Sequence, residues 1–374
     1  MIFFIRSYIA DFDARMGKYF DALSEAGVGF RFIGWNKDGR QVPDRPGFHY
    51  FSRRARLGAG WRNAVALLQW NTHVFRRLVK ERRSVSVVHA VDLDAGFSSW
   101  LFCLMFRRPL VLDLYDKYTA VRGIGGFAGK ALDFLERTIA RSAALTIIAS
   151  ADRFSQHGLE PGDSKVLVLE NVPSAAVAPL VPWQAKKPWN IGYFGVLESR
   201  HRGLEDLLAA CRGRPDVRLH VAGYGHLAPQ FSAAAEAGSN VHYYGAMESE
   251  AGLGLMAKMD VIVGMYYLSV PNHRYASPNK YYEHLMLGRP LLTTAGTPPG
   301  ARVEQDVSGW AVAEGEASLT QWLDGLDPEA VMKRGRRAAQ VWDERYASYY
   351  RSHYCGEYVM RIRMLCKGGR QDGR

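Results

Sequence analysis

The sequence predicts an α/β protein made of two doubly wound domains in series, and three observations lead to that fold class. Short apolar runs alternate with stretches of helical spacing, the alternation stops between Asn171 and Asn190, and it then starts again. The chain has 374 residues, which suits two domains of about 150 to 200 residues better than one core. With 48% hydrophobic and 23% charged residues, the composition is globular and excludes collagen-like or wholly disordered chains.

The first half of the chain contains short runs that are apolar throughout, and such runs are typical of parallel strands covered on both faces. We expect strands over residues 2–5, 29–34, 85–90, 110–114, 145–149 and 166–169. The spacing of Met16, Phe20 and Leu23 predicts a helix over residues 13–26 that ends at Gly27. A second helix is expected over residues 130–142. This pattern predicts a doubly wound parallel sheet.

The second half repeats the pattern after a segment rich in Pro, Ala and Val, which we interpret as a linker. Strands are expected over residues 191–194, 218–222, 241–243, 261–264 and 290–293, with helices over 203–211, around 230, 252–259 and 279–287. The sequence thus predicts Rossmann-like domains over residues 1–172 and 190–342, a linker over 173–189, and a C-terminal helix with a basic tail over 343–374. Ligands of such domains bind at the carboxyl ends of the strands, here in a central cleft.

The formal net charge of +11 lies mostly in the first half and is densest between Arg53 and Arg83. This segment holds nine basic residues and one acid, Glu81, interleaved with apolar residues such as Trp61 and Trp70. Two interpretations remain open: a helix that contacts an anionic membrane surface, or a core-packing helix with a solvated basic face. No motif for nucleic-acid binding is present.

The location expected from the sequence is the cytoplasm, peripheral to the inner membrane. The opening Ile2-Phe3-Phe4-Ile5 run has no basic leader or cleavage site and is interpreted as a strand, not a signal peptide. The longest apolar candidate, residues 95–106, is shorter than the ~20 residues that a spanning helix needs. The four cysteines have no metal-binding spacing, which indicates a reducing compartment and no structural zinc.

The segment from Ser277 to Pro290 carries the clearest chemical signal. Ser277 suits a helix N-cap and Pro278 the first helical position, so Lys280 falls in the opening turn, where free backbone N–H groups bind anions such as a diphosphate. Glu283 follows on nearly the same face and can accept hydrogen bonds from vicinal ribose hydroxyls. The alternative is a capped surface helix with an incidental Lys–Glu pair.

Ordered motifs resemble the donor-binding domain of family 4 and related GT-B glycosyltransferases of bacterial polysaccharide assembly. In chain order they are Gly192-Tyr193-Phe194-Gly195, Arg202-Gly203-Leu204, Val221-Ala222-Gly223-Tyr224-Gly225, Tyr244-Gly245, Asp260 and the block from Pro278-Asn279-Lys280 to Pro290. Weaker matches in the first domain are Asp13-Ala14-Arg15, Val88-His89-Ala90-Val91-Asp92, Val111-Leu112-Asp113-Leu114-Tyr115-Asp116 and Leu169-Glu170-Asn171-Val172-Pro173. The resemblance covers about residues 1–340 and implies the GT-B fold, with a last helix that crosses back onto the first domain.

The resemblance also implies roles for individual residues. Glu283 would hold the ribose of a UDP- or GDP-linked sugar, and Arg202 with Lys280 would neutralise the departing diphosphate, where cations stabilise the transition state. The implied donor-side set is Ser277, Asn279, Lys280, Glu283, Arg202, Gly223, Gly225, Tyr244, Gly245 and Met247. The implied acceptor is lipid-linked or a glycan, with no bound cofactor and no metal.

The chain departs from the family pattern at several positions. Tyr275 stands where the family usually has a first glutamate, Val196 where an arginine is common, and Val91 and Tyr115 where histidines are frequent. Retaining and inverting chemistry therefore both stay open, as do a non-catalytic scaffold and a sugar-nucleotide epimerase. An inverting enzyme needs a carboxylate base.

The candidates for this base follow strands of the first domain. They are Asp13, Asp92, Asp113 and Asp116, and we prefer Asp116. His89 is expected to contact the acceptor or the sugar.

Overall fold

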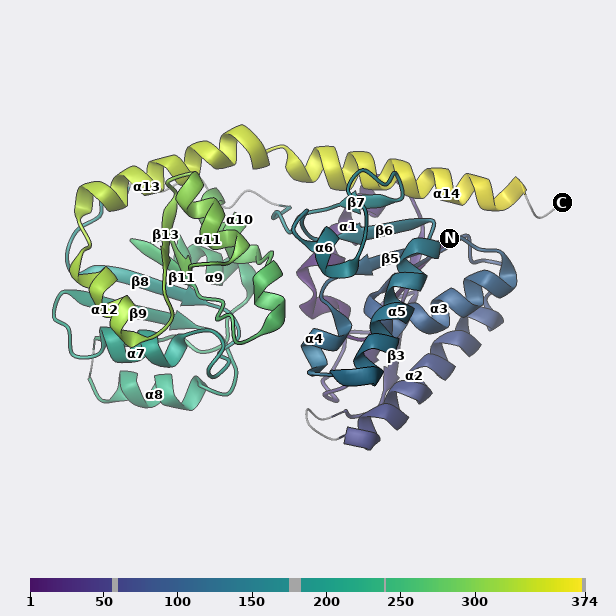
Figure 1. Ribbon diagram of the computed structural model, residues 1–374, viewed down its shortest axis with the longest axis horizontal. Coiled ribbons are helices and arrows are strands. Elements are labelled where there is room, and N and C mark those ends of the chain that lie inside the picture. The colour runs from purple at the N-terminus through teal and green to yellow at the C-terminus, as the bar shows by residue number, and fades with distance from the viewer. Residues whose placement is uncertain (56–59, 175–182, 239, 372–374) are drawn as a thin grey trace. The chain divides into compact units, whose positions relative to one another are not determined.

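The computed structural model describes residues 1–55, 60–174, 183–238 and 240–371, with the side chains of 60–62 and 369–371 left aside. It contains two compact units (Figure 1): unit 1 comprises Met1–Glu170 and Arg351–Arg374, and unit 2 comprises Asn171–Tyr350. Much of the expected linker, and Trp61 of the basic segment, lie outside this description.

Unit 1 is built on a seven-stranded parallel sheet in the order β3-β2-β1-β4-β5-β6-β7. The strands are β1 Ile2–Arg6, β2 Phe30–Asn36, β3 Phe48–Ser52, β4 Val87–Val91, β5 Leu110–Leu114, β6 Leu145–Ile148 and β7 Val166–Val168. The parallel strands expected from apolar runs are confirmed. The sequence analysis did not anticipate β3, an edge strand that is only half-buried and so lacks a continuous apolar run.

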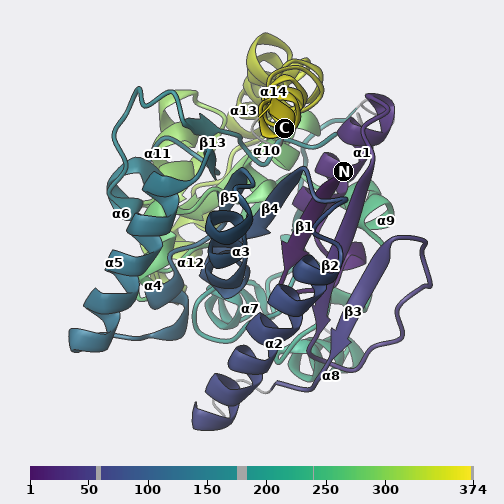
Figure 2. The same ribbon diagram turned by 90° about the vertical axis from the view of Figure 1, so that its right-hand side faces the viewer.

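Helices cover both faces of this sheet (Figure 2). One face packs against α2 Gly60–Lys80, α3 Asp92–Phe106 and α5 Gly126–Ser142. The other packs against α1 Ala14–Glu25 and α14 Val359–Gln371. Two short helices, α4 Tyr118–Arg122 and α6 Arg153–His157, follow β5 and β6. No helix in the described parts of the chain is long and apolar enough to cross a membrane.

Helix α2 makes up most of the basic segment. The described aromatic and aliphatic side chains of this helix are divided between the core and the surface. Trp70 and Leu78 are fully buried, and Trp70 stacks on Trp35 with ring centroids 5.7 Å apart. Phe75 is half-buried against the same core. Leu68 is exposed. Most of the apolar side chains that the sequence analysis noted in this helix therefore serve the core.

Unit 2 repeats the architecture with a six-stranded parallel sheet in the order β10-β9-β8-β11-β12-β13. Its strands are β8 Trp189–Phe194, β9 Val217–Ala222, β10 Val241–Tyr243, β11 Val261–Gly264, β12 Leu291–Thr294 and β13 Gly309–Val312. Its α-helices are α7 Leu204–Cys211, α8 Ala228–Glu236, α9 Ser249–Met256, α10 Asn279–Met286, α11 Pro298–Gln305, α12 Glu316–Asp324 and α13 Pro328–Val341.

The C-terminal helical segment returns to the first half of the chain, as expected. After α13 the chain runs through π-helical segments at Trp342–Tyr346 and Tyr350–Tyr358 and then enters α14. From Arg351 onwards it belongs to unit 1. Tyr354 and Tyr358 are fully buried there, and the Tyr354 hydroxyl donates a hydrogen bond of 3.0 Å to the carbonyl of Glu170.

Candidate active site

The carboxyl edge of the unit 2 sheet is formed by glycine loops that pack backbone against backbone. A Cβ on Gly223 would lie 1.8 Å from the carbonyl oxygen of Gly195, and one on Gly225 would lie 2.6 Å from that of Leu197. Both glycines have φ of 143°, a conformation that other residues rarely adopt. Only glycine fits at these two positions, and the loops after β8 and β9 therefore lie close together.

Lys280 extends from the first turn of α10 to the loop after β8. Its ammonium group donates to the carbonyl of Phe194 and lies 4.5 Å from the ring centroid of Tyr193. Burial lowers the pKa of Lys280 to about 8, an effect that Glu283 opposes and Arg202 reinforces. The pKa of Lys280 therefore responds to both charged neighbours, and its ammonium stays largely charged at neutral pH.

Arg202 follows the β8 loop and lies over an aromatic ring. Its guanidinium carbon is 5.0 Å from the ring centroid of Tyr266, and its Nε donates to the half-exposed carboxylate of Glu198 at 3.0 Å. Burial lowers the pKa of Arg202, but Tyr266 and Glu198 outweigh this and raise it. Glu198 and Tyr266 were not expected at this site, since an isolated acid or tyrosine in a loop carries no pattern, and Tyr193 was expected only as part of a glycine motif.

The start of α10 differs from the expectation in one respect. The helix begins at Asn279 with Pro278, in an extended conformation (ψ 148°), as its N-cap, so the prediction that Ser277 caps the helix is wrong. Proline offers no side-chain oxygen for the free N–H groups of the first turn. Ser277 instead accepts a hydrogen bond at its carbonyl from Asn171 Nδ2 at 2.8 Å. Asn279 is exposed and Glu283 is half-buried.

The residues expected beside the nucleotide base lie in the loop after β10. Tyr244 is 43% exposed, and its hydroxyl lies 2.9 Å from His220 Nδ1 of β9. The backbone of Gly245 is joined to the glycine loop, because its carbonyl accepts from the Gly223 N–H at 2.7 Å. Met247 is half-buried. This loop thus continues the edge formed by the β8 and β9 loops.

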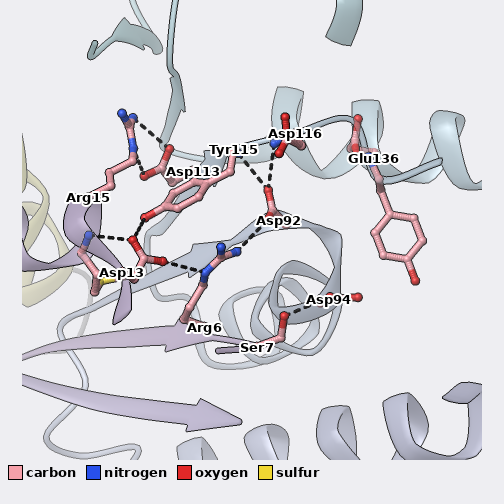
Figure 3. Close-up of polar contacts among 12 residues, drawn as sticks. Arg6, Ser7, Asp13, Arg15, Asp92, Asp94, Asp113, Tyr115, Asp116 and Glu136 are labelled. Atoms are coloured by element: carbon pink, nitrogen blue, oxygen red, sulfur yellow. Dashed lines mark hydrogen bonds and ion pairs between the residues drawn. The ribbon is translucent and has the colours of Figure 1, made fainter. Parts of the chain in front are cut away.

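The corresponding edge of unit 1 is held by ion pairs between acidic and basic side chains (Figure 3). Arg6, at the end of β1, donates to Asp13 at 3.0 Å and to Asp92 at 2.7 Å. Asp92 follows β4 in a left-handed conformation (φ 56°) and accepts from the backbone N–H of Tyr115 at 2.8 Å. Burial raises the pKa of Asp92 to about 6, against the opposing charge of Arg6.

Asp113 is the most deeply buried of the four candidate bases. Its carboxylate has no exposed surface, pairs with Arg15 at 3.1 Å and accepts from the Tyr19 hydroxyl at 2.6 Å. Burial raises its pKa, but Arg15 and His89 outweigh this and bring it to about 2. His89 is also fully buried, with Nδ1 3.0 Å from the Tyr358 hydroxyl. This placement does not favour the direct contact with acceptor or sugar expected for His89.

Asp116 is the most accessible of the four carboxylates. Its side chain is 49% exposed, against 18% for Asp92 and 6% for Asp13, and it pairs with Arg153 at 3.1 Å. Asp13 is also the N-cap of α1, where it accepts from the Met16 N–H at 3.1 Å. Accessibility therefore favours Asp116 as the base.

A neighbouring carboxylate, Asp94, belongs to an Asp-x-Asp spacing with Asp92, which nothing in the sequence indicates to be a metal site. One of its oxygens accepts from Ser7 at 2.9 Å and from Arg122 at 2.6 Å. Its other oxygen is buried and has no hydrogen-bond partner. Among the described residues, no group of three or more His, Cys, Asp or Glu side chains is arranged to hold a metal ion.

Solved structures similar to this chain identify its fold, and a family model matches part of its sequence. Among solved structures, sucrose-phosphate synthase from Thermosynechococcus elongatus matches with a TM-score of 0.69 at 14% identity, covering 98% of this chain and 100% of that chain. HepE from Anabaena in complex with UDP-glucose matches with a TM-score of 0.66 at 15% identity, covering 96% and 99%. WaaG, a glycosyltransferase involved in lipopolysaccharide biosynthesis, matches with a TM-score of 0.60 at 14% identity, covering 95% and 98%.

No curated protein matches the sequence, whereas one family model does. The model is described as a glycosyl transferase 4-like domain, and it matches residues 14–171. This match lies in the half of the chain where the motifs were weaker. Residues 14–171 are thus similar to a glycosyl transferase 4-like domain, and they lie within a chain that has the GT-B fold along nearly its whole length.

Proposed function

We propose that the protein transfers a sugar from a nucleotide-sugar donor to a lipid-linked or glycan acceptor in bacterial polysaccharide assembly. The observation that carries this proposal is the grouping of Arg202, Lys280 and Glu283 at the carboxyl edge of the unit 2 sheet, where Lys280 donates to the Phe194 carbonyl and its pKa responds to both Arg202 and Glu283. Support for a UDP-linked donor comes from HepE, which binds UDP-glucose. A GDP-linked donor is the alternative.

The two cations have the chemistry that the leaving group needs. When the bond from the anomeric carbon to the donor phosphate breaks, negative charge builds up on the nucleoside diphosphate, and Lys280 and Arg202 stabilise it. Glu283 accepts hydrogen bonds from the ribose hydroxyls. The loops around Gly223, Gly225, Gly245 and Met247 let the nucleotide approach the backbone, and Ser277, Asn279 and Tyr244 complete the donor side.

If the sugar is transferred with inversion, Asp116 is the general base that deprotonates the acceptor hydroxyl. Its half-exposed carboxylate at the carboxyl edge of unit 1 supports this role over the buried Asp113. An Asp116→Asn variant should lose transfer while keeping nucleotide affinity, and the matched Asp163→Asn variant, on the loop before β7, should keep both. Transfer that persists at the normal rate in Asp116→Asn would instead favour Asp92 or a retaining mechanism.

We propose that the protein is located at the anionic cytoplasmic face of the inner membrane. Support comes from the basic face of α2, where Arg76, Arg77 and Lys80 line a hollow of about 530 Å³ together with Leu68 and Phe51. None of the described residues that line this hollow carries a carboxylate. Anionic lipid attracts such a surface at roughly 1 kcal/mol per basic residue.

A donor screen tests the proposed activity. Thermal shift against UDP, GDP and their sugars should find one nucleotide that stabilises the protein, by roughly 2.7 kcal/mol at 100 times its Kd. Slow hydrolysis of one nucleotide sugar is then expected, with loss of that hydrolysis in Lys280→Ala. Nucleotide binding without any hydrolysis or transfer would favour a non-catalytic scaffold, the alternative suggested by Tyr275 and Val196. Interconversion of one nucleotide sugar into another would favour an epimerase.

A further inference from the structure

The helix α3 exposes an unbroken apolar face. Its exposed side chains between the start of the helix and its C-cap are Phe97, Leu101, Leu104 and Met105, of which Met105 is 65% exposed. Their spacing of four, three and one residues places them on one side of the helix. The opposite side carries Phe102 and Cys103 into the core. Helix α3 is therefore apolar on its outer side as well as on its inner side, which is unusual for a surface helix.

The neighbouring helix α5 continues this surface. Phe127 and Phe134 are 90% and 72% exposed, seven residues apart and thus on one side of the helix. Helices α3 and α5 contact each other and lie side by side on the same face of the unit 1 sheet (Figures 1 and 2). We name as the α3–α5 face the side chains of Phe97, Leu101, Leu104, Met105, Phe127 and Phe134.

The charged residues at the exposed positions of these helices are all basic. On α5 they are Lys130, Arg137 and Arg141, and α3 ends at its C-cap Arg107. The α5 carboxylates are engaged elsewhere, because Asp133 pairs with Lys117 at 3.3 Å and Glu136 is buried beside His157. Exposed phenylalanine and leucine among arginine and lysine, with the partly exposed Asp133 paired to Lys117, match the chemistry of an anionic bilayer surface.

Helix α2 lies beside α3 in the same layer and adds charge without adding much apolar surface. Trp70 and Leu78 face the core, while Arg76 and Lys80 are exposed. The basic charge of residues 53–83 and the exposed apolar side chains of the α3–α5 face are thus on different helices.

We propose that the α3–α5 face inserts into the interfacial region of an anionic bilayer, with α2 contacting the headgroups beside it. This inference rests on the membrane location in the proposed function and names the surface responsible.

Co-sedimentation with vesicles tests the assignment. On vesicles of phosphatidylglycerol and phosphatidylcholine, the double variants Leu104→Ser with Met105→Ser and Phe127→Ser with Phe134→Ser should each partition at least about tenfold more weakly. The matched control replaces Met360 and Met364, which are 49% and 61% exposed on α14 at the opposite face of the same sheet. This control should change partitioning less than about twofold, which is within the scatter of surface substitutions.

Charge variants and salt separate the two parts of the surface. Replacing Arg76 and Lys80 by Gln should weaken binding about fivefold per charge at low salt and less at high salt. Equal binding of the α3–α5 variants and the parent protein would overturn the assignment. So would a dimer of the parent chain that the same variants abolish, since the face would then be an interface between copies.

Failure of this inference is distinguishable from failure of the proposed activity. Nucleotide-sugar hydrolysis in detergent-free solution does not require a membrane, so it should persist in all four variants. Vesicle binding without any hydrolysis would support the surface and contradict the activity, and hydrolysis without vesicle binding would do the reverse.

Discussion

The two units share a parallel sheet and crossover helices, yet the carboxyl edges of their sheets are organised differently. In unit 1 the charges at this edge neutralise one another, with Arg6 between Asp13 and Asp92 and Arg15 on Asp113. In unit 2 the edge is formed by glycine loops, and Lys280 donates to a carbonyl oxygen instead of a carboxylate. One edge is therefore held by buried ion pairs, while the other places Lys280 and Arg202, with Glu198 and Glu283 near them, beside closely packed backbone.

The difference indicates separate tasks. A network of buried ion pairs fixes side chains and resists rearrangement, because removing one partner leaves a charge without compensation. An edge with glycine loops, a lysine bound to a backbone carbonyl and an arginine in a half-exposed pair can exchange these contacts for an anion. The comparison predicts that substitutions in unit 1 act on stability and that substitutions in unit 2 act on ligand binding and turnover.

The largest expected effect is that of breaking the buried pair in unit 1. Arg15→Ala leaves the Asp113 carboxylate buried without its cation, so unfolding free energy should fall by about 3 to 5 kcal/mol. Denaturant titration followed by circular dichroism measures this. Arg202→Ala, in the half-exposed pair with Glu198, should cost less than about 1 kcal/mol. If both variants lose the same unfolding free energy, the two edges do not differ in the way proposed.

The next effect concerns turnover. Lys280→Ala and Arg202→Ala should each remove about 2.7 to 4 kcal/mol of transition-state stabilisation, or ~100- to 1000-fold in rate, by analogy with the loss of one oxyanion donor. Because the Arg202 charge lowers the pKa of Lys280, the effects of the two substitutions should be non-additive in the double variant. Steady-state kinetics measure this, with Arg212→Ala at the far end of α7 as the control. Near-normal kcat/KM in either single variant would mean that the diphosphate is held elsewhere.

Glu283→Gln should give a smaller effect, on binding. The amide retains one acceptor oxygen but loses the charge, so nucleotide affinity should fall by roughly 1.5 to 3 kcal/mol without loss of the fold. Calorimetric titration with the nucleotide identified by the donor screen measures it. Unchanged affinity would remove Glu283 from the ribose site.

The smallest effect is the pH dependence of nucleotide binding. The pKa of Lys280 is lowered to about 8 by burial, so the free protein loses this charge as pH rises through 8. Because an anion binds the protonated form, affinity should fall above pH 8, by at most about 1.4 kcal/mol per pH unit. In Lys280→Arg the guanidinium stays charged and the profile should be flat. If the nucleotide affinity of the parent protein is constant from pH 7 to 9.5, Lys280 does not contact the phosphate.

The sequence predicted most strands because their signals are local, and the donor-side residues stay a prediction that rests on an equally local signal. Apolar runs mark covered strands, and the Pro-Asn-Lys block combines a helix start with its charges. It did not predict β3 or β13, two edge strands whose partial burial weakens the pattern, nor that Pro278 would itself be the N-cap. The pairing of Arg15 with Asp113 joins residues 98 positions apart, and no local pattern in a single sequence specifies such a contact.

The sequence shows that residues 95–106 are apolar, but it does not show which of these side chains are buried and which are exposed. Periodicity could not tell which side of this helix faces the sheet, since both sides are apolar. The converse holds for α2, where Trp70 suggested a membrane contact in the sequence and is buried in the structure. Only tertiary packing distinguishes a core tryptophan from one at a lipid surface.

The return of the chain to unit 1 has a consequence for synthesis. The hydrogen bond between His89 and Tyr358 joins residues 269 positions apart, and Tyr354 and Tyr358 fill the α1 face of the first sheet. While a ribosome is still translating unit 2, that face of unit 1 lacks its cover, although all seven strands have already emerged. The half of the protein made first is thus completed last, and a nascent chain has to hold an incomplete domain in solution until the final helix arrives.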